Sequence, residues 1–189
     1  DWWLTIAHPE LREKGYRTQA DVTHPDHDRI VFNCLQDVIQ ATGVKYIGIG
    51  SDEWWHSPKK DEQPDPLLRG KTRAQAFMEF HQRVAEFCRQ QGVRPIMHED
   101  MLVRWHNGHR YDVSEHLDQL PRDFIIAIWA YLDRNTRYLS EKGFEVWVSP
   151  NAFNAYPAKK LSPWLEASAV ISTASIPCLS GYSPATLPP

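Results

Sequence analysis

The chain has 189 residues, of which 42% are hydrophobic and 24% charged, as is ordinary for one globular domain that buries a core. A formal net charge of −3 gives no general electrostatic reason to expect nucleic acid or an anionic membrane as a partner. No apolar run approaches the roughly 18 residues that a membrane-spanning helix needs, so no membrane segment is predicted.

Amphipathic helices and short apolar strands alternate along the chain. In the first helix, apolar residues from Ile30 to Ile39 recur with helical spacing, and Gly43 ends the pattern. Residues 46–49 are apolar and partly β-branched, which is typical of a strand buried on both faces. The later predicted elements are, in chain order, a polar loop at 57–70, a helix at 72–92, a strand at 94–97, a short helical segment at 114–120, a strand at 124–129, a helix at 135–142, a strand at 144–148 and a weaker strand at 169–173.

This alternation predicts an α/β fold, because only a crossover connection returns the chain to the same edge of a parallel sheet. An open doubly wound sheet and a closed (β/α)8 barrel are the two alternatives. The glycines near residue 50 are followed by acids, which would repel a phosphate, so no phosphate-binding loop supports the doubly wound fold. Side chains capable of chemistry follow the strand ends at 52–53, 98–100, 129–131 and 151, and this placement favours the barrel.

The segment KYIGIGSDEWW at 45–55 carries the most specific pattern. It resembles the fourth-strand motif of glycoside hydrolase family 20, the β-N-acetylhexosaminidases. The later segments GVRPIMHEDML, FIIAIWAY and GFEVWVSPNAF resemble the fifth, sixth and seventh strands of that family, and the resemblance covers about 24–156. It implies a (β/α)8 barrel from about strand four onward. Because a complete barrel is typically ~250 residues, residues 1–189 are expected to be a single fragment of a catalytic domain.

Two adjacent carboxylates, Asp52 and Glu53, suit glycoside hydrolysis. The reaction needs an acid for the departing oxygen and negative charge near the oxocarbenium centre. The resemblance implies that Glu53 is the general acid and later base. It also implies that Asp52 orients the 2-acetamido group of the substrate, whose carbonyl oxygen is the nucleophile. Repulsion between the two charges should raise one pKa and favour a protonated Glu53 near neutral pH, whereas a solvated turn or a helix N-terminus is the structural alternative.

Further residues near the predicted strand ends are candidates for sugar binding. Trp129 resembles the tryptophan with which the family walls the acetamido group, and Tyr156 resembles its tyrosine that holds the acetamido oxygen. Core packing is the alternative for Trp129, and covering of the barrel rim is the alternative for the tryptophans that follow the acids. The other substrate-binding candidates are Trp54, Trp55, His98, Glu99, Asp100 and Asn151, and either Glu99 or Asp100 could instead support the site from behind the residues that touch the sugar.

Three positions depart from the family pattern. Gly48 stands where the family has histidine, Ser51 where it has a second glycine, and His98 where it commonly has tryptophan. The first change removes a hydrogen-bonding partner from beneath the acids. These departures are compatible with a divergent subgroup, with a related family that cleaves another acetamido sugar, or with a lectin-like barrel that binds glycan without cleaving it.

A metal-dependent barrel hydrolase is a third interpretation, because His56, His98, Glu99 and Asp100 follow strand ends and could hold a divalent cation. No two histidines share a strand as His-x-His or a helix as His-x-x-x-His, so neither a metal nor another cofactor is predicted. The predicted function is therefore removal of terminal N-acetylhexosamine from glycans by substrate-assisted, retaining hydrolysis. The expected partner is a carbohydrate that carries a 2-acetamido sugar.

Overall fold

The structure is a computed structural model that describes residues 2–15, 19–54, 63–106, 112–129 and 132–148. Within these residues, four strands form one sheet in the order β1-β2-β3-β4, and each pairs in parallel with the next along the chain. The strands are β1 (Tyr46–Gly50), β2 (Arg94–His98), β3 (Ile125–Ile128) and β4 (Glu145–Val148). A doubly wound sheet reverses its strand order at a switch point, whereas these four strands follow one another without a reversal.

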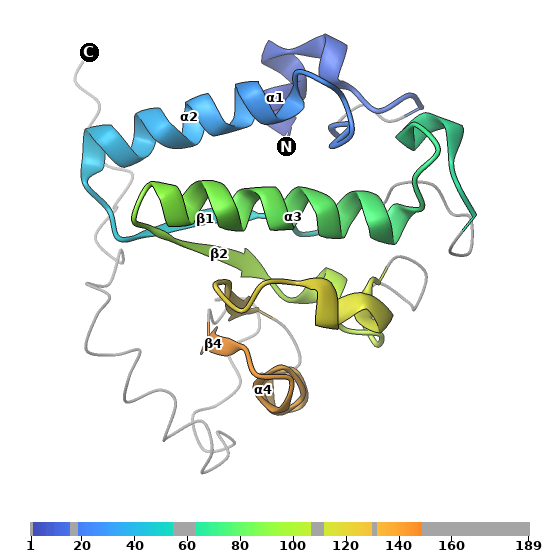
Figure 1. The fold of residues 1–189 in the computed structure, drawn as a ribbon. Helices are drawn as coiled ribbons and strands as arrows, with labels where there is room; N and C mark the ends of the chain where they lie inside the picture. The colour runs from blue at the N-terminus through green and yellow to red at the C-terminus, as the bar shows by residue number, and fades with distance from the viewer. Residues whose placement is uncertain (1, 16–18, 55–62, 107–111, 130–131, 149–189) are drawn as a thin grey trace, which may run out of the picture.

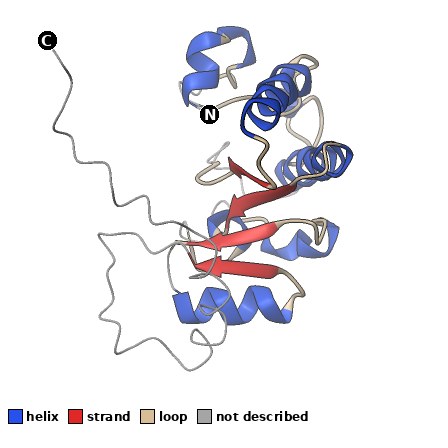
Figure 2. Cartoon of the chain, turned by 90° about the vertical axis from the view of Figure 1, so that its left-hand side faces the viewer, coloured by secondary structure: helices blue, strands red, loops and turns tan. Residues whose placement is uncertain are grey.

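The helices lie around one side of this sheet, as Figures 1 and 2 show. Helix α3 connects β1 to β2, and helix α4 connects β3 to β4. Two short 3-10 segments, η3 (Asp100–Leu102) and η5 (Ser114–Gln119), lie between β2 and β3. The α-helices are α1 (Trp2–Ala7), α2 (His27–Thr42), α3 (Arg73–Gln90) and α4 (Leu132–Glu141).

Helix α3 forms where the sequence predicts it, and its local signals explain both ends. The hydroxyl of Thr72 accepts a hydrogen bond from the backbone N–H of Gln75, and the Gln75 side chain accepts one from the backbone N–H of Thr72. This reciprocal pair satisfies two N–H groups that a helix start leaves unpaired. Gly92, with φ of +69°, follows the other end, and Val84 packs in the core with no exposed surface.

The sheet curves strongly enough to bring side chains of its outer strands together. The ring centroids of Tyr46 on β1 and Trp147 on β4 are 5.1 Å apart, although three interstrand steps would separate these strands by ~14 Å in a flat sheet. A salt bridge of 2.6 Å likewise joins Arg94 on β2 to Glu145 on β4 across the intervening strand. This curvature is what a sheet needs in order to close into a barrel.

Most predicted elements are confirmed. The strand predicted at 169–173 and part of the loop at 57–70 lie outside the described residues, and α1 was not predicted. Burial on both faces is confirmed for β3 but is wrong for β1, where Tyr46 is 44% exposed and Gly48 is also exposed. The exposure is confined to one face of the strand, because Tyr46 and Gly48 alternate with the buried Ile47. No helix among the described residues has the length and hydrophobicity to cross a membrane.

Candidate active site

The two adjacent acids lie in a sharp turn at the carboxyl end of β1. Three residues of this turn have left-handed backbone conformations, with φ of +70° at Gly50, +64° at Ser51 and +50° at Glu53. Residues other than glycine rarely adopt this conformation, because the Cβ atom then crowds the following carbonyl oxygen. At Gly50 a Cβ atom would also lie 3.2 Å from Oδ1 of Asp52, and glycine avoids this close contact.

Asp52 faces His98, which lies at the end of the neighbouring strand β2. The Oδ1 atom of Asp52 is 3.4 Å from Nδ1 of His98, and both side chains are partly exposed. The contact with His98 lowers the pKa of Asp52, while the same contact raises the pKa of His98. Each group therefore favours the charged form of the other, and Asp52 stays ionised over a wide pH range.

The surroundings of Glu53 shift its pKa in the opposite direction. Partial burial raises the pKa of Glu53, and the negative charges of Asp100 and Asp52 raise it further. Asp100 is fully buried in η3, and its Oδ2 accepts a hydrogen bond of 2.7 Å from the backbone N–H of Glu53. The predicted direction of the Glu53 pKa is therefore supported, but burial and Asp100 contribute more to it than the adjacent acid does. Two neighbouring carboxyls whose pKa values are pushed apart suit an acid and an anion in one reaction.

Glu99 connects the ends of two strands through buried hydrogen bonds. Its side chain has no exposed surface, and its two oxygens accept hydrogen bonds from the backbone N–H of Trp129 at 3.1 Å and from Nδ2 of Asn135 at 3.2 Å. These bonds join the end of β2 to the end of β3 and to α4. The burial of Glu99 favours the supporting role over a sugar contact, and the fully buried Asp100 contacts the backbone of the acid turn.

The predicted tryptophans occupy different environments. Trp54 is only 6% exposed and stacks on Phe77 at 5.7 Å between ring centroids, while the guanidinium of Arg73 lies 5.6 Å from its ring. Its faces are thus covered by protein, which does not fit stacking on a sugar. Trp129 is half-buried, lies beyond the end of β3 and packs beside His106, with 4.9 Å between the ring centroids. It therefore remains a candidate for the side chain that walls the acetamido group. The remaining candidates lie outside the described residues; they are Trp55, Asn151 and Tyr156.

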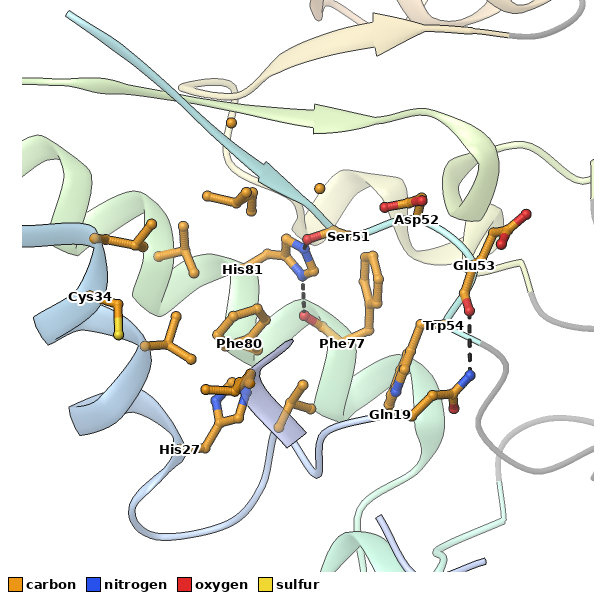
Figure 3. A pocket seen from close by; sticks show the side chains of 18 residues that line it. Gln19, His27, Cys34, Ser51, Asp52, Glu53, Trp54, Phe77, Phe80 and His81 are labelled. Atoms are coloured by element: carbon orange, nitrogen blue, oxygen red, sulfur yellow. Dashed lines mark hydrogen bonds between the residues drawn. The ribbon is translucent and has the colours of Figure 1, made fainter. Parts of the chain in front are cut away.

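His81 on α3 contacts the acid turn, and the sequence analysis did not select it. Its Nδ1–H donates a hydrogen bond of 2.7 Å to the carbonyl oxygen of Phe77, and burial lowers the pKa of His81 to about 4. The neutral ring therefore presents an unprotonated Nε2, which accepts the hydroxyl hydrogen of Ser51 at 2.9 Å (Figure 3). One signal could have identified this residue, since a histidine on the apolar face of a predicted helix needs polar partners.

A cavity of about 550 Å³ lies between β1, α2 and α3, with the acids at one end (Figure 3). Its deeper walls are apolar, and the Glu53 side chain points away from them. Sugar hydroxyls need polar partners, so the acid end fits a sugar better than the apolar depth does. No group of three or more potential metal ligands occurs among the described residues, and His56 of the metal interpretation lies outside them.

Comparisons with known proteins identify the family and the fold. The sequence model of the catalytic domain of glycosyl hydrolase family 20 matches residues 5–170. The solved structure of dispersin B is 19% identical with a TM-score of 0.57, and the match covers 90% of this chain and 49% of that one. A β-N-acetylhexosaminidase from Bacteroides fragilis NCTC 9343 is 19% identical with a TM-score of 0.53, and the match covers 76% of this chain and 28% of that one.

The two structural matches support the fold, and a search of curated protein sequences finds no match. The chain spans about half or less of the length of these two solved structures. The catalytic domain of the matched family is a (β/α)8 barrel, which confirms the predicted fold class, and the four curved parallel strands represent part of it. Because the family model covers most of the sequence, this chain belongs to glycosyl hydrolase family 20.

Proposed function

We propose that this protein is a glycoside hydrolase that removes terminal N-acetylhexosamine residues from glycans, and that it uses a substrate-assisted, retaining mechanism. Its membership of family 20 supports the reaction class. The observation that carries the proposal is the pair of opposite pKa shifts at Asp52 and Glu53, which lie side by side at the carboxyl end of β1. That end of the strands is where (β/α)8 barrels carry their active sites.

The proposed reaction assigns a separate task to each acid. Protonated Glu53 gives its proton to the glycosidic oxygen as the bond to the leaving sugar breaks. Ionised Asp52 accepts a hydrogen bond from the acetamido N–H of the substrate, and the acetamido carbonyl oxygen then attacks the anomeric carbon. Glu53, now ionised, removes a proton from the water that opens the cyclic intermediate, so the anomeric configuration is retained. His98 preserves the charge of Asp52 during these steps.

Hydrolysis of chromogenic N-acetylglucosaminide and N-acetylgalactosaminide by the full-length protein tests this proposal. Glu53→Gln removes the proton donor and Asp52→Asn removes the anion, so we expect each to lower kcat by roughly 100-fold or more. Asp118→Asn is a matched control, because that side chain is 92% exposed. Absence of hydrolysis by the wild type, or hydrolysis that is indifferent to Glu53→Gln, would contradict the assignment.

A second experiment tests the role of the substrate in its own cleavage. A thiazoline that mimics the cyclic intermediate should inhibit the enzyme, and substrates that lack the 2-acetamido group should not be cleaved. Both results follow if the acetamido oxygen is the nucleophile. Equal cleavage of a plain glucoside, with no inhibition by the thiazoline, would indicate a nucleophile supplied by the protein.

A further inference from the structure

Ser51 occupies an unfavourable backbone conformation directly before the two acids. Its φ of +64° lies in the left-handed region that glycine adopts without steric cost. The turn nevertheless carries serine here, and the serine hydroxyl has a defined partner 30 positions along the chain, Nε2 of His81 at 2.9 Å. A hydrogen bond between the side chain and a residue outside the turn can keep the backbone in a conformation that the residue would not otherwise prefer.

His81 is suited to this task because its ring is fixed on every side. It is 1% exposed, and its Nδ1 donates to the Phe77 carbonyl oxygen within the same helix. Its ring lies 4.0 Å from the Phe77 ring, 5.1 Å from Phe80 and 5.6 Å from Phe124, measured between centroids. The helix and these rings therefore set the direction of Nε2, which points to Ser51 at the end of β1 (Figure 3).

The acid turn is held at a second point on its other side. The backbone N–H of Glu53 donates to Oδ2 of Asp100, which is buried in the segment after β2. His81 and Asp100 thus fix the residues immediately before and immediately after Asp52. Displacement of either point would move both carboxyls relative to a bound sugar, and catalytic geometry tolerates displacements of only about half an ångström.

We propose that His81 is a positioning residue for the reaction, because its Nε2 holds the Ser51 hydroxyl and so fixes the left-handed turn that carries Asp52 and Glu53. This inference rests on the proposed hydrolase function. Neither His81 nor Ser51 needs to touch the substrate. Their contact stabilises the left-handed backbone conformation at position 51, which a glycine would adopt without such a contact.

A mutant cycle in the full-length protein tests the contact. His81→Phe keeps the aromatic packing but removes the acceptor, and Ser51→Ala removes the donor but keeps the side chain that disfavours a positive φ. We expect each to lower kcat about tenfold, with KM changed less than about twofold, and the double variant to lose no more than either alone. Gln82→Ala, at the next and exposed position of α3, should leave kcat and KM unchanged.

Rescue separates positioning from general damage to the core. In the His81→Phe background, Ser51→Gly should recover at least about threefold in kcat, because glycine adopts the turn without an anchor. His81→Gln, which can place a polar atom near Nε2, should retain more activity than His81→Asn, which can only replace Nδ1. If His81→Phe abolishes cooperative thermal unfolding, Ser51→Ala decides the matter, because it leaves α3 intact.

Hydrogen exchange distinguishes failure of this inference from failure of the proposed function. Amides of residues 50–54 should exchange faster in His81→Phe and in Ser51→Ala than in the wild type, whether or not the protein hydrolyses a substrate. A wild type without hydrolase activity would contradict the function alone. Unchanged exchange, multiplicative losses of kcat in the cycle, or an absence of rescue by glycine would overturn the positioning role.

Discussion

Asp52 and Glu53 are neighbours in sequence, yet their surroundings push their pKa values in opposite directions. His98 lowers the pKa of Asp52, whereas partial burial and Asp100 raise the pKa of Glu53. The sequence predicted the pair and the direction for Glu53, because two like charges at a strand end repel. It could not predict the partners, which come from the end of β2 and meet the turn only when the strands pair.

Asp100 provides a test of the Glu53 environment. Asp100→Asn removes a negative charge but keeps an oxygen that can accept the Glu53 N–H, so the turn should persist. Without that charge the pKa of Glu53 falls, and the protonated acid is lost at lower pH. We expect the alkaline limb of the kcat/KM profile to move to lower pH, as measured with a chromogenic substrate. An alkaline limb that stays in place or moves upward would show that Asp100 does not influence the acid.

His98 provides the complementary test on Asp52. His98→Gln removes the group that favours the ionised carboxylate, so the pKa of Asp52 should rise. Asp52 then becomes protonated at a higher pH as the solution is acidified, and the acid limb of kcat/KM should move to higher pH. His8→Gln, which changes an exposed histidine in the N-terminal part of the chain, should leave the profile unchanged. The same acid limb in His98→Gln and in the wild type would contradict this coupling.

The departures from the family pattern have different structural consequences. Gly48 was expected to remove a partner from beneath the acids, and it leaves open space there, since a Cβ atom would meet nothing within 4 Å. Ser51, in contrast, takes the left-handed conformation and bonds to His81. Residue identity alone could not rank these two changes, because their effects depend on backbone conformation and on a contact between separate elements.

At the scale of elements, hydrophobic periodicity and capping signals predicted α3, the end of α2 and the four strands within one or two residues. These signals are local, so a sequence displays them directly. Between β2 and β3, the helical segment predicted at 114–120 forms as η5, whereas η3 was not predicted because a single short turn has no periodic pattern. For Glu99 the sequence left open a sugar contact or a supporting role behind the site, and its burial beneath the strand ends favours the supporting role.

Asn135 on α4 is central to that buried network. It has no exposed surface, donates to Glu99, and accepts a hydrogen bond of 2.5 Å from Nε1 of Trp105. Asn135→Ala leaves a buried carboxylate and an indole N–H short of partners, so we expect the free energy of unfolding to fall by about 2–3 kcal/mol. Urea denaturation measures this loss. Ser140→Ala on the exposed side of α4 should change it by less than about 0.5 kcal/mol, and an equal effect of both changes would contradict the network.

At the scale of the whole molecule, the predicted class follows from buried strands that alternate with amphipathic helices. The sheet confirms this with its unreversed strand order and with the contact between Tyr46 and Trp147 across its curved face. The exposed face of β1, which carries Tyr46 and Gly48, was not predictable, because an apolar run has the same sequence whether or not other side chains cover that face. The place of His81 on the apolar face of α3 indicates its burial, but its contact with Ser51 was not predictable, since that contact requires α3 to pack behind the end of β1.

Burial of a neutral histidine makes the stability of the whole fold depend on pH. Burial lowers the pKa of His81 to about 4 in the folded chain, from 6.5 for an unperturbed histidine. Between these values the unfolded chain binds a proton at His81 that the folded chain does not, so stability falls as pH falls through this window. The contribution of His81 should shrink by about 2 kcal/mol between pH 7.5 and pH 5.

Urea unfolding of the wild type and of His81→Phe at pH 7.5, 6 and 5 measures the contribution of His81 to the pH dependence of stability. Asp28 and Asp52, whose pKa values are lowered, lose their contributions at more acidic pH. Every other titrating group is present in both proteins and cancels in the comparison. We expect the wild type to lose more stability than His81→Phe over this range, so the difference between the two proteins should narrow on acidification. A difference that stays constant with pH would mean that His81 is not held neutral inside the fold.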